Sequence, residues 1–262
     1  MARERRLVFG ETAESYDRYR PTYPPALIDD LVVMAGLDGQ RAVLEAGAGT
    51  GKATVLFAAR GIPVVAVEPS PEMAAVARRA CAEYSHVEVH ESDFEAWDPQ
   101  GQTFPLLYSG QAWHWVPPEA GLARAREALD RGGLMAVFWN RPVWTRAELR
   151  EPLMAVYERM PELEGDSPMH PANLLPDAGI DWRGQIACAP GLGDAEIRYY
   201  DWSRRYTAEE YTGLLGTTSE FSLMPEERRA PVLGAIGAVI EAHGGAMELP
   251  MTTRVCLARR EG

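Results

Sequence analysis

The sequence predicts an α/β fold, a doubly wound and mostly parallel sheet of seven strands with a cap inserted after the fifth strand. Two observations carry this prediction. Short apolar runs alternate with helical segments of ten or more residues, and this alternation is typical of right-handed crossovers between parallel strands. From residue 140 to about 195, prolines and glycines interrupt the pattern over a stretch that is too long for an ordinary loop.

The individual elements follow from apolar periodicity and from capping residues. Ser70 before Pro71 is a typical helix start, and Thr207 opens a capping-box pattern. The expected helices cover residues 24–36, 51–60, 71–84, 119–129, 147–160, 207 onward and 225–241. The expected strands cover residues 42–46, 63–68, 87–89, 104–108, 134–139, 197–206 and 251–259. A glycine pair, Gly132-Gly133, is expected to separate the helix of 119–129 from the fifth strand.

Composition limits the possible functions. The chain has 262 residues, 46% of them hydrophobic, and a formal net charge of −12. This apolar content suffices for a core, whereas the acidic balance argues against a nucleic-acid partner. The cysteines Cys81, Cys188 and Cys256 stand far apart, which favours a reduced cytoplasmic location and predicts no metal site. No apolar run reaches the ~18 residues of a membrane span and no signal-peptide core precedes the arm, so we expect no membrane partner.

The most informative stretch is the E-x-G-x-G-x-G pattern from Glu45 to Gly51, which follows a short apolar run. A second apolar run then ends on another carboxylate, Glu68. Glycines at a turn after a buried strand let the backbone approach a ligand closely. A carboxylate at the end of the next strand is placed to bind the hydroxyls of a ribose. Together the two features predict a nucleoside cofactor.

Three cofactors compete for this loop. The dinucleotide pattern G-x-G-x-x-G fails at its third glycine, which is Lys52 here. The phosphate-binding pattern G-x-x-x-x-G-K-[ST] fails twice, at Ala46 and Ala53. S-adenosylmethionine needs no phosphate site, and its ammonium and sulfonium groups are attracted by a carboxylate such as that of Glu45. The third cofactor therefore fits best.

The glycine loop with its acidic strand end resembles the first two motifs of class I S-adenosylmethionine-dependent methyltransferases, whose fold is Rossmann-like. Other segments are similar to the trans-aconitate-methyltransferase-like group of small-molecule methyltransferases: 9–10 and 16–24 in the arm, 109–115 after strand four, 132–140, 207–211 and 249–253. One departure is Glu45, where many members have Asp. The stretch 140–195 matches no motif of the group.

The pattern of elements and this resemblance together divide the chain into four expected parts. Residues 1–36 form an N-terminal arm and helix, and residues 37–140 form the S-adenosylmethionine-binding core. Residues 141–195 form the cap, where we expect substrate choice to lie. Residues 196–262 complete the core sheet.

The resemblance also implies roles for particular residues. Glu45 and the loop glycines would approach the methionine end of the cofactor, Glu68 would hold the ribose, and the arm would close over both. The implied cofactor-binding residues are Tyr16, Arg20, Glu45, Gly47, Gly49, Gly51, Glu68, Pro69, Met73, Asp93, Phe94, Ser109 and Gln111. Structural alternatives stand beside several of these roles, because Asp93 can cap a turn, Tyr16 and Arg20 can be one helix-face contact, and Met73 can be a core residue.

The acceptor site is expected at the carboxyl edge of the sheet, where open α/β sheets bind ligands. The candidate residues are Tyr23, Trp113, Trp115, Trp139, Asn140 and Trp144. Methyl transfer from a sulfonium mainly needs alignment of the reacting atoms. A hydroxyl or ammonium acceptor must also lose a proton, and His114 is the candidate base, although His114 and Trp115 can equally just shape the pocket. His170, in the proline-rich insertion, is expected to be an exposed loop residue.

The sequence therefore predicts a methyltransferase that acts on a small molecule, with S-adenosylmethionine as cofactor. Protein acceptors stay possible, and the acceptor atom can be oxygen, nitrogen or carbon. Two alternatives stay open: a relative that uses the bound cofactor for a cyclisation or decarboxylation, and a cofactor-binding module without catalysis. Formation of S-adenosylhomocysteine distinguishes the first alternative from a methyltransferase.

Overall fold

The computed structural model describes residues 13–160, 169–174, 182–187 and 189–262. Within these ranges the chain forms one seven-stranded sheet in the order β3-β2-β1-β4-β5-β7-β6. Strands β3 to β5 run parallel, whereas β7 runs antiparallel to both β5 and β6. The strands are β1 (Val43–Ala46), β2 (Val64–Glu68), β3 (Val87–Glu91), β4 (Phe104–Gly110), β5 (Leu129–Pro142), β6 (Glu196–Thr207) and β7 (Ala246–Arg259). The predicted α/β fold is thereby confirmed.

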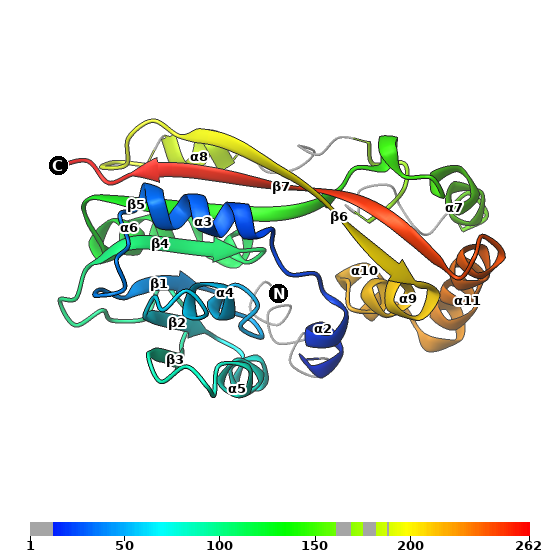
Figure 1. Ribbon diagram of the computed structural model, residues 1–262, viewed down its shortest axis with the longest axis horizontal. Helices are drawn as coiled ribbons and strands as arrows, with labels where there is room; N and C mark the ends of the chain where they lie inside the picture. The colour runs from blue at the N-terminus through cyan, green and yellow to red at the C-terminus, as the bar shows by residue number, and fades with distance from the viewer. Residues whose placement is uncertain (1–12, 161–168, 175–181, 188) are drawn as a thin grey trace.

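Helices cover both faces of this sheet (Figure 1). The α-helices are α2 (Ala13–Tyr19), α3 (Pro25–Met34), α4 (Thr54–Ala58), α5 (Pro71–Ala80), α6 (Pro118–Ala128), α7 (Arg150–Tyr157), α8 (Trp182–Ala187), α9 (Ala208–Gly216), α10 (Ser219–Ser222) and α11 (Glu226–Ala242). Two short 3-10 helices, η2 (Trp113–Trp115) and η3 (Trp144–Arg146), follow β4 and β5. In the described part of the chain, no helix combines the length and the apolar character that crossing a membrane requires.

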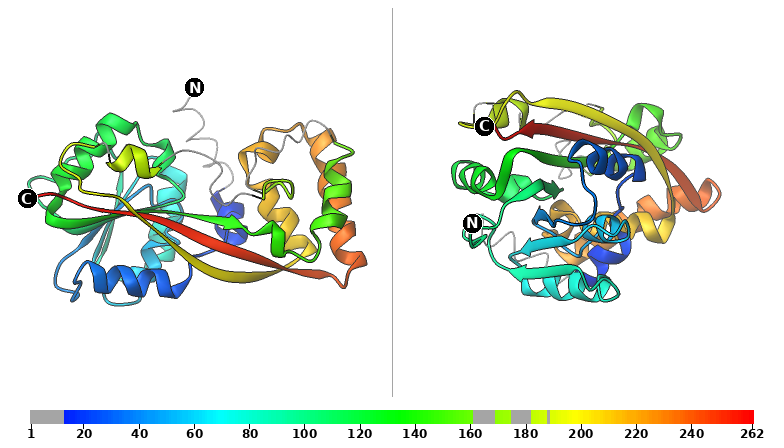
Figure 2. Two further views of the ribbon diagram at one scale, coloured as in Figure 1. Left: turned by 90° about the horizontal axis from the view of Figure 1, so that it is seen from above. Right: turned by 60° about the vertical axis from the view of Figure 1, so that its left-hand side comes forward.

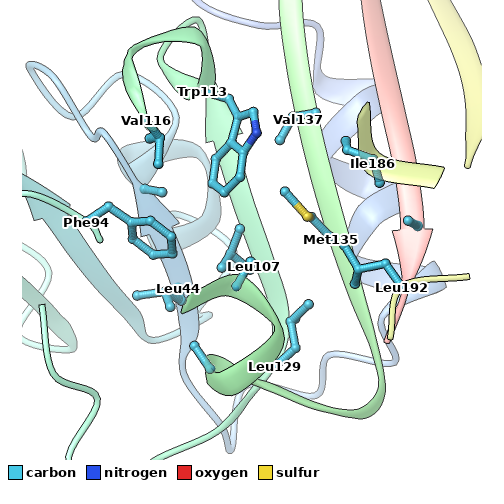
Figure 3. Packing of buried hydrophobic residues seen from close by; sticks show 14 of the residues in the cluster. Leu44, Phe94, Leu107, Trp113, Val116, Leu129, Met135, Val137, Ile186 and Leu192 are labelled. Carbon is cyan, nitrogen blue, oxygen red and sulfur yellow. The ribbon is translucent and has the colours of Figure 1, made fainter. Parts of the chain in front are cut away.

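Side chains alternate between two hydrophobic clusters along the central strands. In β1, Val43 faces the cluster that contains α3 and α4, whereas Leu44 faces the cluster that contains α6 and α8. This period of two is expected for a sheet that is covered on both faces. Figure 3 shows the second cluster, where Met135 and Val137 of β5 lie opposite Ile186 of α8. The two clusters hold the helices against the sheet, and the candidate functional site lies at the carboxyl edge of this sheet.

A third cluster forms a separate helical lobe, which we define as η3, α7, α9, α10, α11 and the adjoining ends of β6 and β7. Figure 2 shows this lobe at one end of the molecule, with β5, β6 and β7 running into it from the main sheet. The insertion 141–195 contributes to two clusters, because Trp144 and Leu153 pack in the helical lobe while Ile186 packs on the main sheet. Its role as a substrate cap stays a prediction.

Several element boundaries differ from the sequence expectation, and the starts of β5 and β7 differ by five residues each. The pair Gly132-Gly133 lies inside β5, because Leu129 already pairs with Phe104 and the ladder shifts its register before Leu134. Strand β7 begins at Ala246 rather than at 251, since its first residues pair with β6 alone, from Thr207↔Ala246 onward. The strand propensity of single residues does not predict where β5 and β7 begin, because these extensions form only where a neighbouring strand offers a pairing partner.

The capping box that the sequence predicts at Thr207 can be tested by mutation. The Thr207 side chain accepts the backbone N–H of Glu210, and the Glu210 side chain accepts the backbone N–H of Thr207. We expect Thr207→Ala to lower the free energy of unfolding by about 1 kcal/mol, or roughly 2–4 °C in thermal midpoint for a chain of this size. Glu210→Gln keeps an acceptor at the same place and serves as the control. Equal losses in both variants would contradict this assignment.

Candidate functional site

The glycine loop joins β1 to α4 at the carboxyl edge of the sheet. Gly47, Gly49 and Gly51 have φ of +73°, +59° and +87°, a region that residues with a Cβ rarely adopt. At Gly47 a Cβ would also lie 2.4 Å from the Cβ of Ala112, in the segment after β4. The loop therefore requires glycine both for its backbone shape and for its close approach to the neighbouring strand end.

Glu68 holds this loop against the end of β2. Its Oε2 accepts the backbone N–H of Gly49 at 2.8 Å, and its Oε1 accepts the backbone N–H of Ser70 at 2.9 Å. Ser70 is the expected N-cap of α5, since its hydroxyl accepts the backbone N–H of Met73 at 3.3 Å. Glu68 is only 7% exposed. One carboxylate thus fixes two adjacent turns, and Pro69 between them is half-buried.

Glu45 lies in the middle of β1 and is 1% exposed. Its Oε2 accepts hydrogen bonds from the hydroxyl of Thr54, at 2.5 Å, and from that of Tyr108, at 3.0 Å. Burial, and to a smaller extent the charge of Glu68, raise the pKa of Glu45 to about 8, against the lowering effect of these two hydrogen bonds. A cation beside Glu45 would favour its ionised form.

The N-terminal arm, helix α2, contacts both the glycine loop and the helical lobe. The Nζ of Lys52 donates to the carbonyl of Asp17 at 2.6 Å. Tyr16 packs against a small cluster that contains Met73. The guanidinium of Arg20 lies 4.9 Å from the centre of the Tyr16 ring, and it donates to the hydroxyl and the carbonyl of Thr217 at 2.9 Å and 2.8 Å. Figure 1 shows α2 between the sheet and α9.

Asn140 holds the segment that follows the arm. Its amide donates to the carbonyl of Thr22 at 2.9 Å, and its Oδ1 accepts the hydroxyl of Thr253 at 2.6 Å. The Thr253 hydroxyl also accepts the indole N–H of Trp202 at 3.0 Å. The next residue, Tyr23, is 6% exposed and its ring lies edge-on to Phe138 at 4.8 Å. Asn140 therefore positions the arm, and both residues lie near the strand ends, as expected.

His114 lies in η2 with an exposed side chain. The indole N–H of Trp139 donates to its Nδ1 at 3.4 Å, and the Trp115 ring is centred 4.8 Å away. Partial burial of the ring, and then the charge of Arg141, lower the pKa of His114 below its ordinary value. The ring is thus neutral at neutral pH. With Nδ1 accepting from Trp139, the proton of the neutral ring lies on Nε2.

Other predicted cofactor residues serve the loop backbone. The Ser109 hydroxyl donates to the carbonyl of Ala46 at 2.7 Å, joining β4 to β1. Gln111 has a φ of +58°, and its N–H donates to the carbonyl of Phe138 at 2.8 Å. Asp93 follows β3, where its carbonyl accepts the N–H groups of Ala96 and Trp97, both at 3.0 Å. The contacts of Ser109 and Gln111 join the end of β4 to β1 and β5, whereas those of Asp93 are local to the turn after β3.

Several predicted site residues lie in hydrophobic clusters, among them Phe94, Trp113 and Trp144. Trp113 is 2% exposed, and its ring lies 5.7 Å from that of Phe94, which is 3% exposed. Figure 3 shows both side chains inside the cluster that covers one face of the sheet. Trp144 is 1% exposed in the helical lobe. The structure therefore brings Trp115 and Trp139 together around His114, but not Trp113 or Trp144.

The expectation that His170 is an exposed loop residue is wrong. His170 is 6% exposed, and its ring packs edge-on against Tyr157 at 4.5 Å. Sequence reasoning also missed Tyr108, Thr54, Lys52 and Thr217, which hold Glu45 and the arm. Of these, Tyr108 could have been noticed as a hydroxyl inside an apolar strand. Among the described residues, no three His, Cys, Asp or Glu side chains are grouped to hold a metal ion.

Residues 43–133 match the model of the methyltransferase domain family. An uncharacterized methyltransferase of Mycobacterium tuberculosis is 26% identical over 260 residues, covering 97% of this chain and 96% of its own length. A trans-aconitate 2-methyltransferase of a Mycobacterium species is 33% identical over 164 residues, which cover 57% of this chain and 62% of that protein.

Solved structures show the same fold. A structure described as a type II methyltransferase from Anaeromyxobacter dehalogenans superposes with a TM-score of 0.64 at 19% identity, covering 93% of this chain and 98% of that one. The [4+2]-cyclase SpnF superposes with a TM-score of 0.51 at 16% identity, over 93% of this chain and 84% of that one. The fold and the glycine-loop site define a class I methyltransferase fold. Residues 43–133 of this chain thus match a methyltransferase domain, and almost the whole chain is similar to a methyltransferase.

The steric role of Gly47 can be separated from its φ. We expect Gly47→Ala to lower the thermal midpoint by more than Gly36→Ala, the matched control. Both positions have positive φ, +73° and +62°, which costs about 1–2 kcal/mol with a Cβ. A Cβ at Gly36 meets nothing within 4 Å, whereas at Gly47 it overlaps Ala112. Equal losses, measured by thermal denaturation, would exclude the close approach.

Burial of Glu45 makes stability depend on pH. Because the folded pKa of about 8 lies above the ordinary 4.5, the folded state keeps a proton that the unfolded chain releases in this window. The free energy of unfolding should therefore decline as the pH rises from about 4.5 to about 8. Glu45→Gln should remove this part of the decline, in denaturant titrations at several pH values. Parallel pH profiles of the two proteins would show that Glu45 titrates normally.

Proposed function

We propose that this chain transfers a methyl group from S-adenosylmethionine to a small molecule. The observation that carries the proposal is the pair of buried acidic side chains, Glu45 and Glu68, on either side of a loop made of positive-φ glycines. Such a loop gives a ligand access to backbone, and its acids suit a ligand with cationic groups and ribose hydroxyls. The match of residues 43–133 to the methyltransferase domain family supports the same cofactor.

The residues present fit this cofactor. Glu68 would hold the ribose hydroxyls, Glu45 would face the cationic methionine end, and Gly47, Gly49 and Gly51 would leave room for it. When bound, the cofactor supplies a methyl group that is already activated on a sulfonium. Tyr16 on α2 and Arg20, directly after α2, would then close over it, since the arm already reaches the loop through Lys52.

The chain's own contribution is alignment. The arm segment at Tyr23, held by Asn140, and the His114–Trp139 pair lie beside the ends of β4 and β5. Holding the acceptor there at a fixed distance replaces a bimolecular encounter by an oriented one. To act as a base through Nε2, the neutral His114 ring must carry its hydrogen on Nδ1. In the arrangement with Trp139 the hydrogen lies on Nε2 instead, and this N–H can donate a hydrogen bond to the acceptor. Both roles suit an acceptor oxygen.

A small acceptor is supported by two observations. The formal charge of −12 disfavours a nucleic acid as the substrate, because binding to its phosphates requires Lys and Arg. The relative of 33% identity is named for the methylation of trans-aconitate, a small molecule. The insertion 141–195 and the helical lobe would then enclose the acceptor, which excludes water from the reacting atoms.

The cofactor assignment is tested by calorimetric titration with S-adenosylmethionine, S-adenosylhomocysteine and NAD. We expect binding of the first two only. Glu68→Ala should weaken both by roughly 10–100-fold, because a hydrogen bond to a charged group is worth ~1.5–3 kcal/mol.

Glu68→Gln is the control, since it keeps one acceptor oxygen for the loop and should retain part of the affinity. Formation of S-adenosylhomocysteine with an acceptor panel then tests methyl transfer itself. Binding of NAD, or undiminished affinity in Glu68→Ala, would sink the proposal.

A further inference from the structure

Helix α2 lies between two parts of the molecule that are far apart in the sequence. It packs on α5, which begins beside the glycine loop, and on α9 of the helical lobe. Figure 1 shows this position of α2. The helix has only seven residues, whereas an isolated helix shorter than about 12 residues is marginal in water. Its conformation therefore depends on the two surfaces that it contacts.

The first surface carries the proposed cofactor site. Lys52, directly after the glycine loop, donates to the carbonyl of Asp17 at 2.6 Å, and its Nζ lies 3.3 Å from the Asp17 carboxylate. Ala13 is buried in a small cluster with Met73 of α5. The carboxylate of Glu68 fixes the turn at which α5 begins. One side of α2 is thus attached to both segments that Glu68 joins.

The second surface is the C-terminal end of α9. Thr217, the C-cap of α9, is 2% exposed. The guanidinium of Arg20, directly after α2, donates to its hydroxyl at 2.9 Å and to its carbonyl at 2.8 Å. A cation at the C-terminus of a helix is favoured by the helix dipole, and hydrogen bonds from a charged donor are stronger than neutral ones. This half-buried contact therefore holds the end of α2 to the lobe, whereas the exposed pair of Arg18 and Glu209 adds little.

The contact between α2 and α9 requires a glycine. A Cβ at Gly213 would lie 2.6 Å from the ring of Tyr19, so the ring can take its place only where α9 has no side chain. Inside a helix, glycine is less favourable than alanine. The packing of Tyr19 is a physical reason for the glycine at this position. Gly216, in the same helix, has no such neighbour, because a Cβ there would meet nothing within 4 Å.

We propose that residues 13–20 form a strap through which α9 controls cofactor binding, with Gly213 and Thr217 as positioning residues that act through the arm. Since α2 is too short to keep its place alone, loosening its contact with α9 loosens its hold on the glycine loop. By linkage, a cofactor bound at the loop then restrains α9 in return. The identity of the cofactor rests on the proposed function, whereas the strap itself is a property of the fold.

Calorimetric titration with S-adenosylhomocysteine tests the effect on affinity. Gly213→Ala should weaken binding by roughly fivefold or more, a typical allosteric coupling, although alanine favours the helix. Gly216→Ala, the matched control in the same helix, should leave the affinity unchanged. Thr217→Val removes the hydroxyl that accepts from Arg20 and should weaken binding in the same direction. Equal affinities of the two alanine variants would contradict the strap.

A double-mutant cycle distinguishes a strap from two independent contacts. Lys52→Met removes the attachment at the glycine loop, and Thr217→Val weakens the attachment at α9. If one strap connects the two, the combined variant should bind little more weakly than the weaker of the single variants. Losses of affinity that multiply would mean that the two contacts act separately, and the inference would then be wrong.

Amide hydrogen exchange provides a readout that local damage to α9 would not produce. Saturating S-adenosylhomocysteine should slow exchange in α9 of the native chain and of Gly216→Ala, but not of Gly213→Ala. Unchanged exchange in α9 of the native chain overturns the inference.

The failure of the proposed function would look different. If S-adenosylhomocysteine does not bind the native chain, the proposed function fails, and the strap is judged by exchange without ligand. Gly213→Ala should then speed exchange in α2, whereas Gly216→Ala should not. Equal exchange in α2 of the two variants would overturn the strap as well.

Discussion

The carboxylate of Glu68 is the contact on which the geometry of the site depends. It accepts the N–H of Gly49 from the loop after β1 and the N–H of Ser70 from the turn after β2. Two turns that are separate in the sequence thereby become one rigid edge, and a buried charge-assisted pair of hydrogen bonds stabilises it more than neutral ones would. The backbone of the glycine loop is thereby fixed, and so are the positions at which α4 and α5 begin.

Glu45 is held in a different way, inside the sheet, by hydroxyls from α4 and β4. One acid thus accepts hydrogen bonds from two backbone N–H groups. The other accepts hydrogen bonds from two hydroxyls, in an apolar setting that raises its pKa. Two similar residues acquire different properties from their surroundings alone.

Much of this was accessible from the sequence. The order of elements, the glycine loop, Glu68 at a strand end and the caps at Ser70 and Thr207 all follow from local patterns, and the structure contains them. The partners of Glu45 were not accessible, because Tyr108 lies 63 positions away and only the strand order brings it near. For the same reason the burial of His170 and the helical lobe itself were missed. The lobe joins η3 and α7 to α9 and α11, although residues 158–207 separate α7 from α9 along the chain.

Aromatic residues next to strand ends were the hardest to place. Trp113 and Trp139 both follow the pattern of a pocket wall, yet Trp113 packs under α6 and against Phe94, whereas the Trp139 indole reaches His114. The direction of the Trp113 side chain depends on the single turn that follows β4, the short helix η2. Apolar periodicity carries no information about that turn.

The antiparallel ribbon of β6 and β7 has a mechanical consequence. Strand β5 accompanies β7 only as far as the pair Pro142↔Met251, and beyond it residues 246–250 of β7 are paired with β6 alone. Two strands without a third resist bending and twisting less than a full sheet. Any hinge motion that carries α9 and α11 away from the glycine loop would therefore flex this narrow neck, and the main sheet would stay undisturbed.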